Sequence, residues 1–295
     1  MSPKANIVLD ATQLDTYIVC PAKFDFRFNQ NKTPPTTAAP LDRGALIHLC
    51  KEVYYNNLKE HKPWDYCVNE ALVATRFAGT QSDLEAEEVS RILEVLEENL
   101  TYWRIADMSY EIKAVEQPFA YVLYEDELIR VMMIGKMDLV FSDNKYTNCP
   151  MDSKSYERDF STSARRLTNQ FCNYATAMNS NILFMDRIGM QKTVPVEKKH
   201  KRVPLSYDPL ILQQWKENVV KWCYSYYDSV TDNSWPMNLT SCDKYNRLCE
   251  YYEICDSSGV AAKEYKLNVN FATSKKWDPS DVLRKTSDSL IEVGK

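Results

Sequence analysis

The sequence predicts an α/β fold in which a helical N-terminal region precedes a core of strands and helices. Between residues 10 and 110, apolar residues recur at the spacing of helices, whereas three segments after Glu111 are rich in Val, Ile, Met, Tyr and Phe, as strands are. A helix, a fourth strand and a further helix are expected after them. This succession of helices, three strands, helix, strand and helix is typical of an α/β core.

Three signals place helices in the N-terminal region. Apolar residues over 14–18 share one face of a short helix that we expect to stop at Pro21. Apolar positions over 46–53 mark a second helix, and Ser82–Glu85 has the pattern of a capping box that would start a third. The Pro-rich segment 34–40 is expected to be a loop.

The segments after Glu111 are expected to alternate between strands and helices. The three expected strands cover residues 112–123, 128–141 and 146–154, with a turn at Asp143-Asn144 between the last two. After them the pattern predicts a helix over 163–178, a strand over 182–194 and a helix over 207–228.

Composition excludes several classes of protein. Only six of the 295 residues are Gly, and they form neither G-x-G-x-x-G nor G-x-x-x-x-G-K-[ST], so a Rossmann or P-loop nucleotide site is not expected. The longest apolar stretch, Ile129 to Phe141, is interrupted by charged residues and is shorter than the ~20 residues of a membrane span. The first residues lack the apolar region of a signal peptide, so we expect a cytoplasmic protein without a membrane partner.

Asp152-Ser153-Lys154 ends an expected strand and is the first candidate for chemistry. Residues two apart on a strand point to the same face, so the carboxylate and the ammonium are directed to a common point. A turn centred on Lys145 places Asp138 opposite Asp152, and two carboxylates at such short range repel one another unless a cation lies between them. Carboxylate oxygens suit Mg²⁺ or Mn²⁺. An exposed hairpin with ordinary surface charges is the alternative interpretation.

The nine cysteines are expected to serve two purposes, because a cytoplasmic protein is not expected to hold disulfides. Five lie among apolar or helical neighbours and are expected to fill the core: Cys50, Cys67, Cys149, Cys172 and Cys223. The other four are Cys20, which precedes Pro21, and Cys242, Cys249 and Cys255 near the other end of the folded sequence. These four are candidate metal ligands.

Seven short motifs occur in one order along the chain. They are Leu14-x-x-Tyr17-x-x-Cys20-Pro21-x-x-Phe24, Arg43-Gly44-x-x-x-His48, Glu116-x-Pro118-Phe119, Gly135-x-x-Asp138, Asp152-Ser153-Lys154, Gln170-x-x-x-Tyr174 and the three late cysteines. In this order they resemble the RecB-like branch of the PD-(D/E)xK nucleases over roughly residues 10–256. The cysteines are similar to those of its iron-sulfur exonucleases, which include CRISPR-associated and phage proteins. The resemblance implies a PD-(D/E)xK restriction-endonuclease-like core, a mixed sheet flanked by helices.

The resemblance also implies roles for the site residues. The metal, Mg²⁺ or Mn²⁺, would be held by Asp138, Asp152, the Ser153 carbonyl and His48, with Glu116 assisting near it. Lys154 would position the attacking water, while Gln170 and Tyr174, four residues apart on one helix face, would support the site and hold the DNA strand. Without the resemblance, His48 is half of a surface pair with Glu52, Glu116 is an outward strand residue, and Gln170 and Tyr174 are an ordinary helix face.

The four candidate thiol ligands can form one site that joins the two ends of the folded chain. Thiolates bind both Zn²⁺ and iron-sulfur clusters. Gaps of six and five residues separate Cys242, Cys249 and Cys255, whereas zinc sites more often have gaps of two to four. The resemblance implies a [4Fe-4S] cluster, with zinc and plain buried thiols as alternatives. Since the site would close a loop of more than two hundred residues, we expect a structural role.

DNA is the partner that these features imply, although the net charge is −5. Phosphate contacts need only a local basic surface. Arg165 and Arg166 open the expected helix that carries Gln170, and Lys198-Lys199-His200-Lys201-Arg202 is the densest basic run. That run is either a phosphate-binding surface or an ordinary solvated face.

The leading functional prediction is a metal-dependent DNA exonuclease that hydrolyses phosphodiester bonds. We expect it to act on single-stranded ends in DNA repair, recombination or phage-type replication, in the cytoplasm of a bacterium or of a phage-infected host. Without a P-loop it would rely on a separate helicase or recombination protein. The alternatives are a non-catalytic nucleic-acid-binding scaffold stabilised by a metal-thiolate cluster, and a structural metal-thiolate module with an incidental Asp-x-Lys.

One nuclease domain is expected over residues 1–256. It would consist of a helical part over 10–110, an α/β core over 111–230 and a cysteine segment over 235–256 that closes onto Cys20. Residues 257–295 are polar and rich in Lys, and we expect them to form a weakly packed tail.

Overall fold

A computed structural model describes residues 4–35, 39–158, 160–244 and 247–275 of the chain. The chain forms two compact units. The first combines residues 1–36, 120–135 and 213–292, and the second combines residues 37–119, 136–212 and 293–295. All candidate catalytic residues therefore belong to the second unit, and all four candidate thiol ligands belong to the first.

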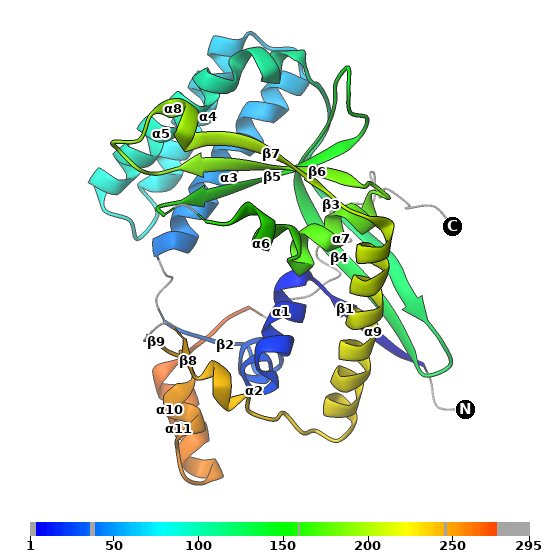
Figure 1. Cartoon of the computed structure of the whole chain (residues 1–295). Coiled ribbons are helices and arrows are strands. Elements are labelled where there is room, and N and C mark those ends of the chain that lie inside the picture. The colour runs from blue at the N-terminus through cyan, green and yellow to red at the C-terminus, as the bar shows by residue number, and fades with distance from the viewer. Residues whose placement is uncertain (1–3, 36–38, 159, 245–246, 276–295) are drawn as a thin grey trace. The chain divides into compact units, whose positions relative to one another are not determined.

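A mixed sheet forms the centre of the second unit (Figure 1). Its strands are β3 (Glu111–Glu125), β4 (Ile129–Ser142), β5 (Cys149–Tyr156), β6 (Ile182–Gly189) and β7 (His200–Ser206). The last four are neighbours in that order, and β3 pairs with β4. β4 and β5 are antiparallel, β5 and β6 parallel, and β6 and β7 antiparallel. Strands of both directions flanked by helices confirm the predicted α/β fold with a mixed sheet.

Three long helices supply the core on one face of this sheet. They are α3 (Ala39–Lys59), α4 (Trp64–Gly79) and α5 (Ala86–Ser109). Their apolar side chains form one buried cluster with Leu139, Met151 and Ile188 of the strands. Because neighbouring residues on a strand point to opposite faces, Asp152 projects from the face opposite to Met151. On that face lies α7 (Asn169–Ala177), whose Gln170 hydrogen-bonds Asp152.

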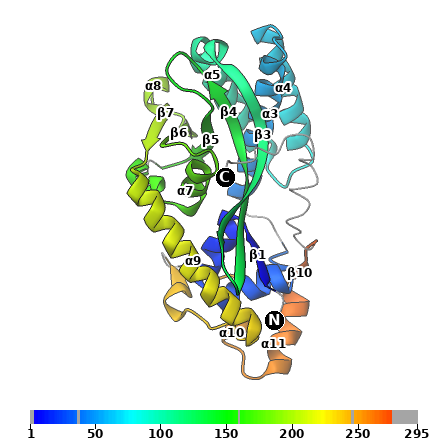
Figure 2. The same ribbon diagram turned by 90° about the vertical axis from the view of Figure 1, so that its right-hand side faces the viewer.

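β3 and β4 form a long hairpin (Figure 2). The Asp126 carboxylate closes its turn by accepting the backbone amides of Leu128 and Ile129, each at 2.8 Å. Within the first unit, β1 (Ala5–Leu9) pairs in parallel with the start of β4. The short strand β1 is not among the elements expected from the sequence.

The first unit contains short helices and very short strands beside β1. Its helical elements are α1 (Ala11–Val19), α2 (Pro21–Phe24), the π-helix η1 (Asp25–Asn29), most of α9 (Pro209–Thr231), η2 (Leu239–Ser241), α10 (Tyr252–Cys255) and α11 (Val260–Asn270). Aromatic rings join three of them, since Tyr17, Phe24 and Tyr226 contact one another edge to face. The first helix ends before Pro21, as its pattern predicts.

Two expected helix boundaries differ from the structure. Ser82–Glu85 does not cap a helix, because Ser82 closes a turn after α4: its hydroxyl donates to the Gly79 carbonyl at 2.8 Å and accepts the Leu84 amide at 3.3 Å. The next helix, α5, begins only at Ala86. The helix expected over 163–178 is divided into α6 (Thr162–Arg166) and α7, because Thr168 has an extended backbone conformation.

Two further segments differ from expectation. The strand expected over 182–194 ends at Gly189, and the basic run 198–202 belongs to α8 (Val196–Lys199) and β7. The expected tail contains α11 and the strand β10 (Ala272–Thr273), which pairs with β2 (Lys32–Thr33). Residues 276–295 of that tail lie outside the described residues.

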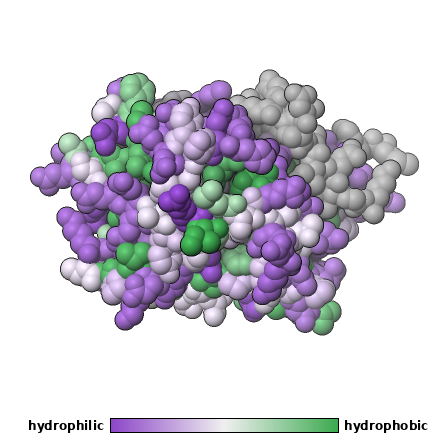
Figure 3. Space-filling model, turned by 90° about the horizontal axis from the view of Figure 1, so that it is seen from above, coloured by the Kyte–Doolittle hydropathy of each residue, from purple (hydrophilic) through white to green (hydrophobic). Residues whose placement is uncertain are grey.

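The face of the molecule seen in Figure 3 is mostly hydrophilic, with apolar side chains in scattered small groups. Such exposed apolar side chains are ordinary on globular proteins. Among the described residues, no helix combines the length and the apolar character that crossing a membrane requires.

Candidate active site

The candidate site lies where the pairing between β4 and β5 ends. Leu139 is opposite Met151 and Phe141 is opposite Cys149, which is the register predicted from a turn centred on Lys145. Asp138 and Asp152 come next on the two strands, beyond the last backbone pair. There the Ser153 amide donates to the Asp138 carboxylate at 2.8 Å instead of to a backbone carbonyl. The end of the ladder thus brings two carboxylates to one place.

Asp152 is the most deeply buried acid of the site, with 1% of its surface exposed. Its Oδ1 accepts a hydrogen bond from Gln170 Nε2 at 3.0 Å, and its Oδ2 lies 2.8 Å from the Lys154 ammonium. Burial raises the pKa of Asp152 to about 6, although the charge of Lys154 opposes the shift. Apart from Lys154, Oδ2 has no hydrogen-bond partner among the described residues. That oxygen has a lone pair available for a cation.

Lys154 is held as an ammonium ion beside this carboxylate. Burial alone would lower its pKa, but the negative charges of Asp152 and Asp138 outweigh burial and raise it. The ammonium also lies 5.9 Å from the centre of the Phe171 ring on α7. Lys154 therefore remains a hydrogen-bond donor, directed to the point that the strand geometry predicts.

Gln170 and Tyr174 share one face of α7, as their spacing predicts. Gln170 Nε2 donates to the Tyr174 hydroxyl at 2.9 Å, and that hydroxyl donates to the Lys136 carbonyl at 2.7 Å. Burial raises the pKa of Tyr174 far above its usual value, so the phenol stays protonated. This chain of hydrogen bonds connects α7 to both β4 and β5 and orients the carboxylate of Asp152.

His48, Glu116 and Asp138 converge beside these residues. One ligand atom from each of the three lies within 4.8 Å of the others. His48 Nδ1 is 3.1 Å from Asp138 Oδ2. Burial opposes protonation of His48, but the hydrogen bond and charge of Asp138 outweigh burial and raise its pKa. The two carboxylates are donors that suit Mg²⁺ or Mn²⁺, and the imidazole nitrogen is a third possible ligand atom.

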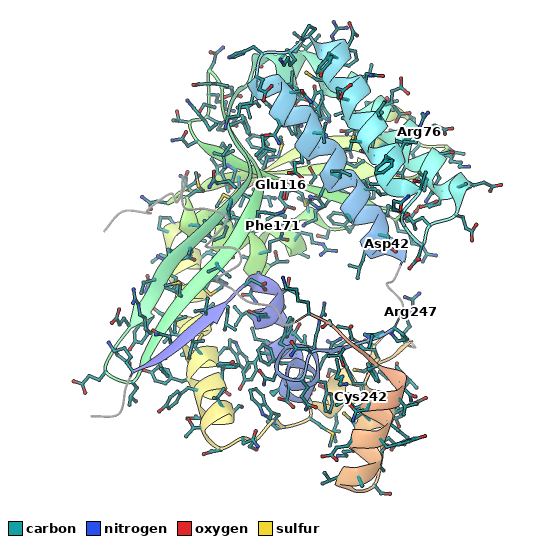
Figure 4. The ribbon with its side chains drawn as sticks, turned by 180° about the vertical axis from the view of Figure 1, so that it is seen from behind. Asp42, Arg76, Glu116, Phe171, Cys242 and Arg247 are labelled. Atoms are coloured by element: carbon teal, nitrogen blue, oxygen red, sulfur yellow. The ribbon has the colours of Figure 1, made fainter. Side chains whose placement is uncertain are left out.

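Glu116 has an unusual backbone for a strand residue. Its φ angle is 50°, in the left-handed region that residues other than Gly rarely adopt. The Glu116 carboxylate pairs with the Lys136 ammonium of the neighbouring strand β4, and Figure 4 labels Glu116 on the sheet. Burial and the charge of Asp138 raise the pKa of Glu116, while Lys136 opposes the shift. The local kink in β3 thus places a carboxylate at the candidate metal site.

A family model of the PD-(D/E)XK nuclease superfamily matches residues 9–256. The chain belongs to this superfamily. A comparison with curated proteins gave no significant match.

Membership of the PD-(D/E)XK nuclease superfamily implies metal-dependent nuclease activity with DNA as substrate. Such nucleases typically use Mg²⁺ or Mn²⁺, and the carboxylate oxygens of Glu116 and Asp138 fit a hard cation of this kind. The free lone pair of Asp152 Oδ2 fits such an ion as well. Ser153 is 5% exposed, with its amide already committed to Asp138.

The candidate thiol ligands gather within the first unit. The loop that carries Cys242 (Figure 4) bonds to the N-terminal segment, since the Asn238 amide donates to Cys20 Sγ at 3.4 Å and the Asn238 side chain to the Val19 carbonyl at 2.8 Å. Burial raises the pKa of the Cys255 thiol to about 11, with further increases from the charges of Cys20, Cys249 and Cys242. The other five cysteines are buried, as predicted for core residues.

The residues predicted to contact DNA differ in their surroundings. Arg165 is exposed on α6, and its charge lowers the pKa of Lys154, so it lies near the site. Arg166 instead donates to the Ser206 carbonyl at 3.1 Å.

The basic run 198–202 is not a solvated or phosphate-binding face throughout: Lys199 and His200 are buried against Glu98. Lys199 ends α8 and His200 begins β7, and the Glu98 carboxylate on α5 receives both side chains.

A buried ionic network near the site escaped sequence reasoning. Lys51 on α3 pairs with Asp186 on β6 at 3.0 Å, and Arg202 on β7 pairs with Asp107 on α5 at 2.6 Å. Arg202 also lies 3.6 Å from Asp186. The sequence does contain a pattern that indicates this network. Asp186 is a charged residue within an apolar strand, and Lys51 lies one helical turn after His48.

Proposed function

We propose that the chain is a Mg²⁺- or Mn²⁺-dependent DNA exonuclease of the RecB-like branch. The observation that carries the proposal is the convergence of His48, Glu116 and Asp138 within 4.8 Å, next to the buried pair of Asp152 and Lys154. A non-catalytic scaffold has no use for this concentration of buried charge. Each buried ion destabilises the fold unless a partner or a ligand compensates for it.

His48, Asp138, Asp152 and the Ser153 carbonyl would hold the metal, with Glu116 assisting. When bound, the metal lowers the pKa of a water and neutralises the charge that develops on the scissile phosphate. Lys154 orients the attacking water, because its ammonium is fixed by Asp152 and cannot turn away freely. Gln170 holds the Asp152 carboxylate in one orientation, and Tyr174 fixes Gln170.

The substrate strand would be held by local contacts in spite of the net negative charge. Arg165 is the best placed cation, since it is exposed near Lys154 and can reach a phosphate. We propose Arg166, Gln170 and Tyr174 as further contacts or supports of the strand. Arg166 donates to the Ser206 carbonyl, which fixes the helix that presents Arg165.

We infer that the substrate is a single-stranded DNA end, processed in repair, recombination or phage-type replication in a bacterial or phage-infected cytoplasm. The absence of a P-loop motif from the sequence supports a division of labour in which a separate helicase or recombination protein opens the duplex. The nuclease would then hydrolyse one strand without using nucleotide energy.

Cys20, Cys242, Cys249 and Cys255 would bind a [4Fe-4S] cluster. The sequence spacing supports a cluster over zinc, because gaps of six and five residues separate the three late cysteines, whereas zinc sites more often have gaps of two to four. Anaerobically purified protein is expected to contain iron and to absorb visible light, and protein that contains zinc alone would contradict this assignment.

The catalytic proposal is tested with labelled single-stranded DNA in the presence of Mg²⁺ or Mn²⁺. The parent protein is expected to degrade it, whereas Asp152→Ala and Lys154→Ala should each reduce the rate at least about a hundredfold. Lys145→Ala, an exposed change in the β4–β5 turn, is the matched control and should keep full activity. Equal degradation by the parent and both site variants would refute the assignment.

Circular single strands in the same assay test the exonuclease mode. An exonuclease needs an end, so circles are expected to survive conditions that consume linear strands. Rapid loss of circles would identify an endonuclease. Binding of linear strands without any degradation would favour the scaffold function instead.

A further inference from the structure

Gly44 is a helix residue that the fold itself does not require. Gly in the interior of a helix destabilises that helix relative to Ala, because Gly loses more backbone freedom on folding. Gly44 lies inside α3 and does not have the positive φ angle that would favour glycine. A methyl group built at Gly44 meets no other atom within 4 Å. At Gly79, by contrast, the same methyl would lie 2.5 Å from Val89, so packing explains that glycine.

The open space at Gly44 adjoins the candidate active site. Gly44 precedes His48 by four residues, so the two share one face of α3. The His48 side chain on that face is 35% exposed, and Leu41, one turn earlier near Asp42 (Figure 4), is 64% exposed. Ala45 is exposed as well. Small and apolar groups therefore surround the approach to His48 along this helix.

Charge limits what can pack on this face. Arg43 is turned away, because it pairs with Glu88 at 2.8 Å and with Glu157 at 2.6 Å and its side chain is only 14% exposed. A phosphate group would find no cation of α3 beside Gly44. An uncharged group, such as a deoxyribose or a base, fits the surface better, since Leu41 and Ala45 offer it apolar contact.

We propose that Gly44 is a specificity-determining residue: the nucleotide next to the scissile phosphate packs its sugar or base directly on the α3 backbone at Gly44. This inference rests on the proposed nuclease function and adds one contact to it. A side chain at position 44 would occupy the space that the nucleotide needs. The Cβ of such a side chain would begin in open space, with no atom of another part of the protein within 4 Å.

The test compares Gly44→Leu with the parent in two measurements. Affinity for a fluorescent single-stranded DNA, measured by anisotropy in Ca²⁺ to limit cleavage, is expected to fall about tenfold or more. Hydrolysis of bis(p-nitrophenyl) phosphate with Mn²⁺ should stay within about twofold, because this small diester has no neighbouring nucleotide. Asn56→Leu, an exposed change three turns further along α3, is the matched control and should alter neither measurement.

The possible outcomes separate the role of Gly44 from the proposed nuclease function. Strand affinity unchanged in Gly44→Leu would overturn the inference, as would equal loss of the small-diester reaction, which would place the effect in the metal site. Thermal unfolding at or above the temperature of the parent is expected for Gly44→Leu, since Leu favours helix over Gly. If the parent hydrolyses neither substrate, the proposed function fails, while the binding comparison still decides the role of Gly44.

Discussion

Glu116 combines a strained backbone conformation with a carboxylate at the candidate metal site. Its left-handed conformation destabilises the fold by about 1–2 kcal/mol for a side chain other than Gly. Such strain persists where the surroundings determine the conformation, and it is frequent at functional sites. Here the pairing with Lys136 and the position beside His48 and Asp138 depend on that kink.

Two substitutions at Glu116 separate strain from chemistry. Glu116→Gly keeps the left-handed conformation without strain, so its free energy of unfolding should exceed that of Glu116→Ala by about 1 kcal/mol. Both variants lose the carboxylate and should lose nuclease activity to the same extent. Urea unfolding and a single-strand cleavage assay check the two statements, and equal stability of the variants would show that the backbone is unstrained.

His200 gives the fold a specific dependence on pH. Burial lowers the pKa of His200 from its usual value of 6.5, although Glu98 offsets part of the shift. The unfolded chain therefore binds this proton at higher pH than the folded protein, so the contribution of His200 to the free energy of unfolding decreases as the pH drops below 6.5. The raised pKa values of His48 and Asp152 act in the opposite direction in both parent and variant. The lowered pKa of Glu98 contributes only at lower pH, below the usual carboxyl value of 4.5.

His200→Gln removes that proton and should flatten the decrease just below pH 6.5. Urea unfolding of parent and variant at several pH values between 5 and 8 measures the difference between the two curves. A difference that stays constant over this range would mean that His200 titrates alike in both states.

The sequence predicts those site residues that local strand geometry alone brings together. Asp138, Asp152 and Lys154 follow from strand alternation and a hairpin register, and both come from local spacing. His48 and Glu116 could be proposed only through resemblance, since nothing local indicates that a helix residue and a kinked strand residue meet. Lys51 and Asp186 were missed because they are 135 positions apart in the chain and pair only after folding.

At the scale of elements, α3 carries His48 on one turn and Lys51 on the next. Lys51, which is 2% exposed, pairs with Asp186 and also donates to Asn99. The pair therefore connects α3 with β6 and with α5. Burying two ions adds little net stability, but it strongly penalises arrangements that separate them. This network specifies how α3 lies on the sheet.

Removing one member of the pair should leave the other charge uncompensated. Lys51→Met is expected to lower the free energy of unfolding by about 3–5 kcal/mol. The double variant Lys51→Met/Asp186→Leu should lose less than the sum of the two single changes, which a double-mutant cycle measures. Lys59→Met, at an exposed end of the same helix, is the control. Additive losses in the cycle would contradict a direct pair.

Elements with strong periodicity were predicted well, and irregular ones were not. The three strands expected between residues 112 and 154 and the helix expected over 207–228 are present, because their apolar residues follow a clear pattern. β7 was read as a basic surface because its inward residues are charged and find their partners on α5. α5 begins later than expected because Ser82 bonds locally, which a four-residue motif does not reveal.

At the scale of the whole molecule, the two candidate metal sites belong to different compact units. The division of the chain into one nuclease domain over 1–256 stays a prediction. The two compact units do not correspond to this predicted domain, because each unit is assembled from several separate segments of the chain. The local composition of the sequence does not indicate which distant segments assemble into one unit.

Separate units predict separate effects when one site is lost. Cys255→Ser should abolish iron binding and lower the temperature of unfolding by about 5 °C or more. Hydrolysis of a small phosphodiester, measured below that temperature, should be retained, because every proposed catalytic residue lies in the second unit. Cys172→Ser, which changes a buried core cysteine, should keep its iron. Loss of small-diester hydrolysis together with the iron would show that the cysteine site acts in the chemistry.

The Ser153 amide offers a direct view of the site without any assay of cleavage. Its hydrogen bond goes to the Asp138 carboxylate, whereas neighbouring amides of β5 are bonded within a sheet. In an NMR spectrum of isotope-labelled protein, the resonance of this one amide should shift when Asp138 binds a metal ion. The end of a strand ladder thus supplies the protein with an internal spectroscopic reporter.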